Sequence, residues 1–340
     1  MNAKTIHIEG RDVAFQQEGE DTILRAGLRA GLGFPHECNA GGCGSCKFTP
    51  GEGEIETLWA DPPGLTARDR KKGVMLACQC RAKSDLRIKV RLSPEYEPRI
   101  PPARRMARLA SIHGITHDLR EFRFQAEGKA EFLAGQYAAI EIPGLGSPRC
   151  YSMSNIANER GEWHFQIRRL PGGKGTGLLF DELKEGDEVE IDGPYGLAWL
   201  REDSPRSIVC VAGGSGLAPM VSIARGASAA GLLKTRELHY FYGARTPRDI
   251  CGESFLRELP EFGSRIHFYP AVSSPEQEPG ASWNGETGFI HDAVERRLAN
   301  RLDNFEFYFA GPPPMTQALQ EMLMVKNRVP FGQVHFDRFF

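Results

Sequence analysis

The sequence predicts a chain of three successive folded parts: a small sheet with one helix, a small antiparallel β-barrel, and a parallel sheet covered by helices. The 340 residues suffice for two or three domains, each with its own core. A proline-rich segment at residues 93–103 predicts a semi-rigid linker between the first part and the second. Beyond Ser207 the pattern changes from short alternating runs to apolar strands that alternate with helical stretches.

The first part, residues 1–92, begins with apolar and polar residues that alternate from Lys4 to Phe15, which predicts a hairpin. From Asp21 to Leu32 leucines recur every four residues, which predicts a helix with Asp21 or Thr22 as its cap. Residues 85–90 alternate again and predict the strand that closes this part. Together these elements form a small strand–helix domain.

The second and third parts differ in their periodicity. Residues 104–202 contain closely spaced alternating runs, which predict a small antiparallel barrel; the clearest are 121–125, 136–142, 163–167 and 188–191. Residues 203–340 alternate strands with helices, which predicts a parallel sheet; the strands are 208–212, 237–242, 265–270 and 305–310, and the helices are 218–231 and 292–301.

Composition excludes several classes of function. The formal net charge of −2 argues against nucleic-acid or anionic-membrane binding driven by bulk charge. No apolar run reaches the length of about 18 residues that a membrane span needs. The first residues have the pattern of a strand and lack the apolar run of a signal peptide. We therefore expect a soluble, cytoplasmic protein with no membrane or nucleic-acid partner.

Four of the eight cysteines have a diagnostic spacing. Cys38, Cys43, Cys46 and Cys78 follow the pattern C-x4-C-x2-C…C. This pattern is typical of the ligands of a plant-type [2Fe–2S] cluster, in which four thiolates hold two irons. A zinc site would normally show two pairs of closely spaced cysteines, and only one such pair is present. Unrelated buried cysteines are the remaining alternative.

The residues between these cysteines also suit a cluster. Gly41, Gly42 and Gly44 let the backbone approach closely and direct its N–H groups at the sulfurs, since no Cβ interferes. Cys80 could replace Cys78 as the fourth ligand, but we expect it to be a packed or unliganded thiol.

Two patterns in the barrel region suit a phosphate-bearing heterocycle. Arg149 and Tyr151 are two residues apart on a predicted strand, so that a guanidinium and a ring share one face. The guanidinium could clamp a phosphate while the ring stacks on a planar group. Residues 172–176 could open a short helix whose N–H groups bind phosphate. An ordinary strand and a hairpin turn are the structural alternatives.

A glycine-rich turn in the third part suits a dinucleotide. Residues 211–220 lead from an apolar strand into a helix, although they lack the G-x-G-x-x-G fingerprint. Residues 242–245 and 310–315 also lie at the ends of predicted strands, where open α/β sheets bind ligands. Alone, each segment could be a tight turn of any α/β protein.

These motifs resemble two known families. The first 92 residues resemble a plant-type ferredoxin domain with the β-grasp fold, and the four cysteines match its ligand positions. Residues 149–152 resemble the Arg-x-Tyr-Ser motif of the ferredoxin reductase superfamily. The resemblance implies that Arg149 binds the FAD pyrophosphate, that Tyr151 stacks on the isoalloxazine, and that Ser152 lies near the flavin N5 atom.

The resemblance implies further cofactor residues. A second flavin segment would contribute Arg168, Gly173, Lys174, Gly175 and Thr176, and the NAD domain would contribute Gly213, Gly214, Ser215, Gly216, Arg245, Gly311, Pro312, Pro313 and Met315. Motif order is closer to that of NADH-using members, but Arg245 and Arg248 could read the 2′-phosphate of NADPH. Phe339 or Phe340 would be the terminal ring that covers the flavin; a docked hydrophobic tail is the alternative.

Over its full length the chain resembles reductase components of bacterial multicomponent oxygenases. The resemblance implies electron flow from NADH to FAD, to the [2Fe–2S] cluster, and on to a terminal oxygenase or its ferredoxin. A flavin is needed because NADH gives two electrons and the cluster takes one. Aromatic-ring dioxygenases and di-iron monooxygenases are both candidate partners. A reductase for a non-oxygenase acceptor, such as a sugar-deoxygenating enzyme, and a non-catalytic electron-carrier module are the alternatives.

Overall fold

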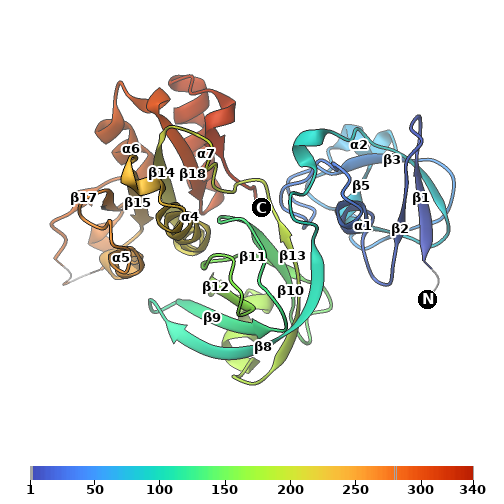
Figure 1. Ribbon diagram of the computed structural model, residues 1–340, viewed down its shortest axis with the longest axis horizontal. Coiled ribbons are helices and arrows are strands. Elements are labelled where there is room, and N and C mark those ends of the chain that lie inside the picture. The colour runs from blue at the N-terminus through green and yellow to red at the C-terminus, as the bar shows by residue number, and fades with distance from the viewer. Residues whose placement is uncertain (1–2, 279, 281, 340) are drawn as a thin grey trace. The chain divides into compact units, whose positions relative to one another are not determined.

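The computed structural model describes residues 3–278, 280 and 282–339, and its chain divides into two compact units (Figure 1). Unit 1 contains Met1–Arg104, Asp192–Leu197 and Asp337–Phe340. Unit 2 contains Arg105–Ile191 and Ala198–Phe336. In the described part of the chain, none of the helices combines the length and the apolar character that a membrane span requires. Each unit is built around its own sheet or sheets.

Unit 1 is built on a five-stranded mixed sheet in the order β2-β1-β7-β3-β5. β1 pairs antiparallel with β2, as the predicted hairpin requires, and parallel with β7, so the first and last strands of the domain lie side by side. A two-stranded sheet, β4-β6, and two helices complete the unit. The bounds are β1 (Lys4–Ile8), β2 (Ala14–Gln17), α1 (Ile23–Arg29), β3 (Lys47–Pro50), β4 (Ile55–Thr57), α2 (Ala67–Lys71), β5 (Met75–Leu76), β6 (Cys80–Ala82) and β7 (Leu86–Lys89).

Helix α1 begins where the sequence predicts. The Thr22 hydroxyl accepts a hydrogen bond from the Arg25 N–H at 3.3 Å, which caps the first turn. The helix ends at Arg29, earlier than the predicted Leu32, because Gly31 takes a left-handed conformation with φ of 76°. Gly27 faces the ring of Phe34 so closely that a side chain at Gly27 would overlap the ring.

A buried ion-pair network fixes the end of α1 within unit 1. The carboxylate of Asp21 accepts hydrogen bonds from Arg29 and Arg104, and Arg29 also donates to Asp192 at 2.8 Å. Arg29 further donates to the carbonyl of Pro102 at 3.0 Å. The proline-rich segment predicted as a linker is therefore packed as part of unit 1.

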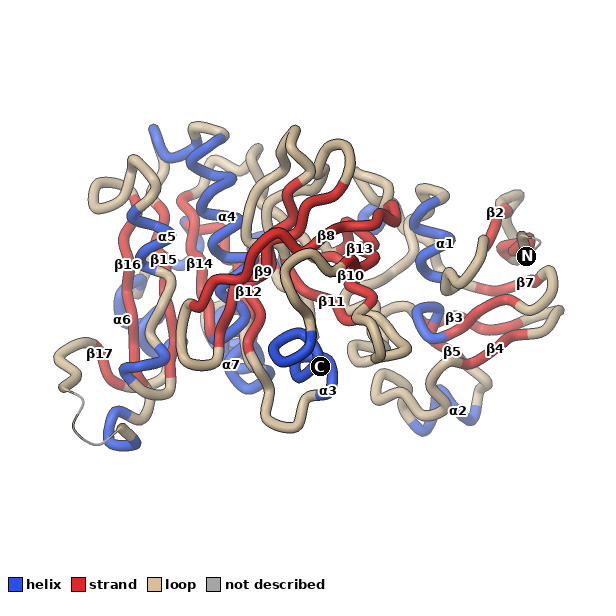
Figure 2. Tube along the Cα trace, turned by 90° about the horizontal axis from the view of Figure 1, so that it is seen from below, coloured by secondary structure: helices blue, strands red, loops and turns tan. Residues whose placement is uncertain are grey.

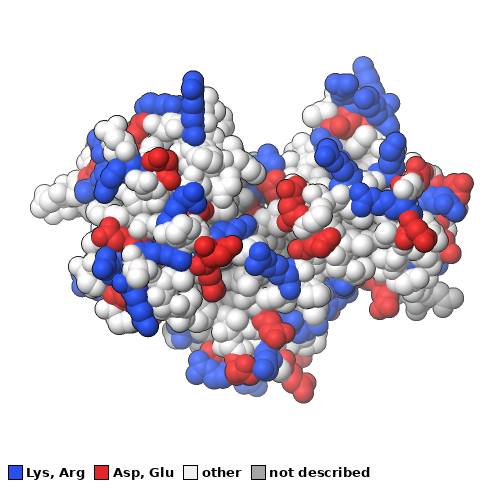
Figure 3. All heavy atoms as spheres, turned by 45° about the horizontal axis from the view of Figure 1, so that its top comes forward, with Lys and Arg blue, Asp and Glu red and all other residues white. Residues whose placement is uncertain are grey.

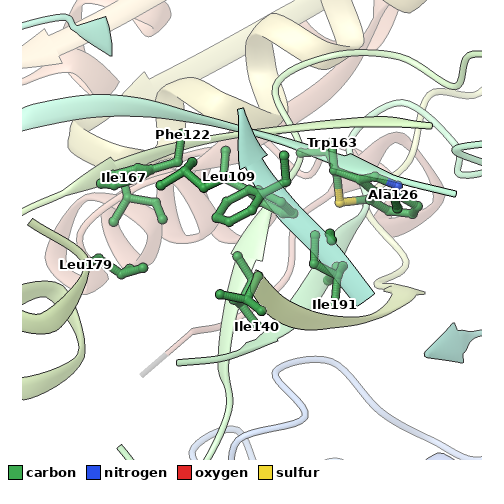
Figure 4. Close-up of a cluster of buried hydrophobic side chains, with 14 of the residues drawn as sticks. Leu109, Phe122, Ala126, Ile140, Trp163, Ile167, Leu179 and Ile191 are labelled. Carbon is green, nitrogen blue, oxygen red and sulfur yellow. The ribbon is translucent and has the colours of Figure 1, made fainter. Parts of the chain in front are cut away.

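The first half of unit 2 is a six-stranded, barrel-like sheet in the order β11-β10-β13-β8-β9-β12. Its core consists of apolar side chains that several strands of this sheet contribute, among them Leu109, Phe122 and Trp163 (Figure 4). The longest strand, β8, was not among the strands predicted from the sequence. The bounds are β8 (Ala103–Gly114), β9 (Leu119–Ala126), β10 (Tyr137–Glu141), β11 (Arg149–Ser152), β12 (Glu162–Arg168) and β13 (Glu188–Tyr195), with helix α3 (Lys174–Gly177) between the last two.

The second half of unit 2 is a parallel six-stranded sheet in the order β17-β16-β15-β14-β18-β19, part of which Figure 2 shows side by side. Successive residues of β14 alternate between its faces: Cys210 packs on the side of α4, and Val211 packs on the side of α6 and α7. The bounds are β14 (Ser207–Gly213), α4 (Leu217–Ala229), β15 (Leu238–Ala244), α5 (Glu253–Arg257), β16 (Ile266–Val272), β17 (Glu286–Thr287), α6 (Ile290–Leu298), β18 (Phe305–Ala310), α7 (Pro313–Gln320) and β19 (Val334–His335). The predicted parallel, helix-covered sheet is confirmed.

The ion-pair network yields a prediction about pH. Burial alone would raise the pKa of Asp21, but hydrogen bonds and charge from Arg29 and Arg104 outweigh it and lower this pKa. The charged Asp21 therefore stabilises the folded state fully above the unfolded-state pKa of about 4. This stabilisation is lost only as the pH falls through the lower folded-state pKa. Asp21→Asn should destabilise unit 1 by about 2 kcal/mol.

Thermal unfolding of the protein, followed by circular dichroism, measures this difference from about pH 8 to about pH 5. The gap between wild type and Asp21→Asn should stay constant across that range. Asp12→Asn, a substitution at an exposed carboxylate of the same unit, is the control and should have little effect. A gap that closes between pH 8 and pH 5 would contradict the assignment.

Candidate cofactor-binding sites

The loop after α1 brings the four predicted cysteines together as two pairs. The thiols of Cys38 and Cys43 interact with each other, and those of Cys46 and Cys78 form the second pair. Backbone N–H groups point at the sulfurs: the Cys43 amide donates to Cys38 Sγ at 3.4 Å, and the Ser45 amide donates to Cys43 Sγ at 3.5 Å. Two pairs of thiols suit two irons with two ligands each, and the amides suit an anionic cluster.

The pKa values of the paired thiols diverge. The thiol of Cys38 lowers the pKa of Cys43 by hydrogen bonding, and Cys46 lowers that of Cys78 in the same way. The pKa values of Cys38 and Cys46 are raised by their partners and by burial. Cys80 lies outside the two pairs, on β6 opposite Thr57, where burial raises its pKa to about 12. Its position agrees with the expected packed thiol.

Close backbone contacts shape this loop. Gly44 has φ of 76°, and a Cβ placed on it would lie 2.5 Å from the carbonyl oxygen of Gly64. Gly41 has φ of 86°, and its carbonyl accepts a hydrogen bond from the Gly64 N–H at 3.0 Å. The loop and the Gly64 segment therefore lie in direct backbone contact, which a side chain at Gly44 would prevent.

A carboxylate beside the first cysteine binds an arginine from the end of the chain. Glu37 accepts hydrogen bonds from Arg338 Nε at 2.7 Å and Nη2 at 2.6 Å, and from the Ser45 hydroxyl at 2.7 Å. No sequence pattern predicts this contact, because 301 residues separate its two charges. Phe339 follows Arg338 in unit 1 and is 37% exposed, while Phe340 lies outside the described residues. The proposed flavin-covering role of either ring stays a prediction.

The flavin motif forms the edge of the barrel-like sheet. β11 pairs with β10 so that Tyr151 lies opposite Ala138 and Ser152 opposite Tyr137. Arg149 and Tyr151 are two residues apart on this strand and therefore point to the same face. Tyr151 packs against the barrel core, and burial raises the pKa of its phenol, so the phenol stays neutral.

The second flavin segment lies against Arg149. Helix α3 begins at Lys174, as predicted, with Gly173 as its N-cap. A Cβ placed on Gly175 would lie 3.3 Å from Arg149 Cγ, so the arginine and this first turn are neighbours. Thr176 Oγ1 accepts from the Leu170 N–H at 3.1 Å and fixes the entry to the turn. The Arg149 guanidinium itself donates to the Ser147 hydroxyl at 2.8 Å and to the Pro148 carbonyl at 3.0 Å. A cation whose stem lies beside the first turn of a helix suits the binding of a pyrophosphate.

The glycine-rich turn after β14 contacts the loop after β18. Gly216 approaches the carbonyl of Ala310 so closely that any Cβ would overlap it. Gly213 lies beside Met315, and a Cβ on it would be 2.8 Å from the Met315 sulfur. The two loops follow neighbouring parallel strands, in which Ala212 is opposite Ala310. The structure thus places the predicted NAD segments at one edge of the sheet.

A pocket of about 420 Å³ opens at this edge. Five of its lining residues were predicted to bind cofactors: Arg168, Gly214, Arg245, Pro312 and Met315. Arg168 was assigned to the second flavin segment, but the structure places it in this pocket, where its Nε donates to Asp118 at 2.6 Å. Its Nη2 lies 3.9 Å from Asp249.

Asp118 and Asp249 were not predicted from the sequence. Asp118 directly precedes β9 of the barrel-like sheet, and Asp249 lies in a short turn after β15 of the parallel sheet. No local sequence pattern marks the two as neighbours. Burial disfavours charge on Arg168, but the hydrogen bond to Asp118 outweighs it and raises the pKa of Arg168. The guanidinium is thereby held in the lining of a pocket that suits a nucleotide.

Three family profiles match successive parts of the chain. A 2Fe-2S iron-sulfur cluster binding domain matches residues 6–83, an oxidoreductase FAD-binding domain matches 106–199, and an oxidoreductase NAD-binding domain matches 210–321. These matches cover all three sites described above.

Full-length relatives agree with the profiles. The chain is 41% identical to the ferredoxin–NAD(P)+ reductase CarAd of Metapseudomonas resinovorans over 98% of this chain and 99% of the relative. It is 39% identical to the ferredoxin–NAD+ reductase component of the alkene monooxygenase system of Xanthobacter autotrophicus over 96% and 98%. A solved ferredoxin reductase in carbazole 1,9a-dioxygenase has a TM-score of 0.91 and 36% identity, covering 100% of this chain and 99% of that one.

The backbone contact at Gly44 predicts how the cysteine loop tolerates substitution. Gly44→Ala should lower the iron and acid-labile sulfide bound per chain by at least about half, because a Cβ would overlap Gly64 and the left-handed φ disfavours alanine. Gly73→Ala is the matched control, with φ of 66° and no atom within 4 Å of the added Cβ. Equal iron content in both variants would show that the close contact is not needed.

The position of Arg149 beside α3 yields a prediction about flavin binding. Arg149→Ala should purify with less than about a tenth of the wild-type FAD, because a charge-assisted phosphate contact is removed. Flavin absorbance per chain measures the occupancy. Arg160→Ala, which removes an exposed arginine paired with Glu162 in the same sheet, should retain the flavin. Full occupancy in Arg149→Ala would refute the assignment.

Proposed function

Because this chain belongs to the family of ferredoxin–NAD(P)+ reductases that serve bacterial oxygenase systems, we propose that it oxidises NADH and delivers the electrons to an oxygenase or its ferredoxin. It is an NAD(P)H-dependent oxidoreductase with a [2Fe–2S] domain, an FAD-binding domain and an NAD-binding domain. The choice of NADH and the identity of the acceptor are the proposed parts.

When bound, the three groups supply complementary chemistry: the nicotinamide gives a hydride, the flavin accepts two electrons and releases them singly, and the cluster carries one electron. The residues of the chain supply position and electrostatics. Arg149 and the first turn of α3 would hold the flavin phosphates, and Cys38, Cys43, Cys46 and Cys78 would ligate the irons. Backbone N–H groups around Cys38 and Cys43 would stabilise the negative charge of the cluster.

The observation that carries the proposal is the presence of both kinds of site in one chain. Two thiol pairs of unit 1 suit a one-electron carrier. The nucleotide pocket and the Arg149 site of unit 2 suit a two-electron donor and its flavin. A chain with both serves to convert a pair of electrons into single electrons for a protein acceptor.

The nucleotide pocket bears on the choice of donor. Arg245 is exposed at the pocket and has no ion pair among the described residues. It is the residue that would read a 2′-phosphate, so NADPH could bind as well. We propose NADH because the motif order resembles that of NADH-using members and because the alkene monooxygenase relative is named for NAD+.

Removing one cluster ligand should separate the two halves of the reaction. Cys43→Ser should retain about wild-type NADH-dependent reduction of a small dye at the flavin, but lose more than about 90% of cytochrome c reduction, because the dye needs only the flavin site. Cys80→Ser is the control: it alters a buried thiol that lies outside both pairs, and both activities should persist. Equal retention of both activities in Cys43→Ser would contradict the proposed route.

The acceptor itself is tested with purified oxygenase systems of the two classes. A carbazole-type dioxygenase ferredoxin and a di-iron monooxygenase hydroxylase would each be offered to the NADH-reduced protein. Oxidation coupled to product formation with either would support the proposal. Reduction of a non-oxygenase acceptor instead of both would favour the alternative reductase role. Absence of any NADH oxidation would favour a carrier module.

A further inference from the structure

Between β4 and the end of α2, unit 1 exposes apolar and basic side chains that the cofactor assignment does not explain. Leu58 and Trp59 follow β4 directly and are 42% and 45% exposed. Helix α2 follows a few residues later and exposes Arg68, Lys71 and Lys72. We call these five residues the α2 face.

The apolar part of the α2 face touches the cysteine loop. The Leu58 N–H donates to the carbonyl of Gln79, the neighbour of Cys78, at 2.9 Å. The Trp59 ring lies over Gly41, such that a Cβ on Gly41 would be 3.2 Å from the ring. An exposed indole thus lies directly on the loop between the first two cysteines. Large exposed aromatic side chains are a typical feature of protein interfaces.

The basic part carries uncompensated charge. Arg68 is three residues before Lys71 and four before Lys72, so these cations share one face of α2. In the described part of the chain none of the three has an ion-pair partner, whereas the neighbouring Arg70 pairs with Asp61. The one carboxylate of the helix, that of Asp69, is engaged by the cap at Thr66 and by Lys47. The surface therefore presents a net positive charge.

The local charge contrasts with that of the whole chain. The protein carries a formal net charge of −2, so the α2 face cannot be explained by a generally basic composition. Figure 3 shows Lys and Arg side chains gathered on the part of the surface where Figure 1 places α2. Such a patch steers a partner of opposite charge and accelerates encounter at low ionic strength.

We propose that the α2 face is the docking surface for the electron acceptor, and that this acceptor is a protein with an acidic surface around its own redox centre. The proposal rests on the proposed function and deepens it by naming the partner's chemistry. Electron-transfer complexes are small and short-lived, so one aromatic contact and three cations suffice. One NADH reduces two molecules of a one-electron acceptor, with NAD+ and a proton as the other products.

The test compares two haem proteins of opposite surface charge as acceptors, the acidic cytochrome b5 and the basic cytochrome c. The variant Arg68→Glu/Lys71→Glu/Lys72→Glu should slow reduction of cytochrome b5 by about tenfold at low ionic strength and should accelerate that of cytochrome c. Added salt should reduce both effects. The control, Arg87→Glu/Lys89→Glu/Arg91→Glu, makes the same change of charge at three other exposed cations of unit 1 and should do neither.

Trp59→Ala tests the apolar contact separately. It should lower the rate with cytochrome b5 by roughly fivefold and leave its salt dependence unchanged, while Trp59→Phe should recover most of the rate. Iron content and NADH-dependent dye reduction are measured for every variant. They should equal those of wild type, since the α2 face contains no cofactor ligand.

Three results would overturn the docking surface. The first is an equal effect of the two triple variants. The second is a charge-reversed variant that slows both haem acceptors alike. The third is a wild-type dimer, seen by analytical ultracentrifugation, that the variant dissociates, because the face would then bind a second copy of the chain. Failure of the wild-type protein to reduce either haem acceptor, although NADH bleaches its flavin, would instead refute the proposed function.

Discussion

The close packing of backbone against backbone around the cysteine loop is the constraint on which the other features of unit 1 depend. Four thiols and several N–H groups must face one small volume, so the loop between Cys38 and Cys46 has to turn back on itself. Gly44 makes that turn with a left-handed φ and lies against Gly64. The chain that follows, from Gly64 into α2, is thereby held next to the loop. The same contact that shapes the cysteine site also places the α2 face beside it.

Unit 2 also depends on glycines that allow close contacts between segments. A phosphate binds best to N–H groups that no side chain shields, so the turns after strands must be narrow. Gly216 against Ala310 and Gly213 beside Met315 bring two strand ends together, and Gly175 does the same for α3 and Arg149. In each case a missing Cβ lets a second segment close over the site. Arg149 on β11 and Arg168 on β12 of the barrel-like sheet supply the positive charge.

Sequence alone was sufficient where the chemistry is local. Cysteine spacing identified the cluster ligands as a candidate set. Asp21 or Thr22 was expected to cap α1, and Thr22 does so; a cap is predictable because it needs only its own turn. β8 was missed because the exposed Met106 and a register shift between Leu109 and Ser111 interrupt the alternation, although Ala107 and Leu109 are buried at its centre. α7 was missed because it begins with two consecutive prolines. Proline usually interrupts a helix, and it is compatible with α7 only because both prolines lie in the first turn.

Contacts between distant residues were beyond the reach of the sequence. The assignment of Arg168 to a flavin segment followed from its neighbours in the chain, but its position follows from Asp118, which lies on the turn before β9. Glu37 and Arg338 are at opposite ends of the sequence and share no motif. Such pairs form because a partly buried charge needs a partner, and only the fold decides which partner is near.

The distribution of charge matters more here than its total. A balance of 42 basic and 44 acidic side chains excludes strong non-specific attraction to polyanions, and that inference from composition is sound for the chain as a whole. It says nothing about the surface over the cysteine loop, where carboxylates are either few or engaged within the unit. A reductase that must recognise one acceptor and release it quickly benefits from this arrangement. A nearly neutral charge on the rest of the surface disfavours other charged partners. The small basic face orients the acceptor as it approaches.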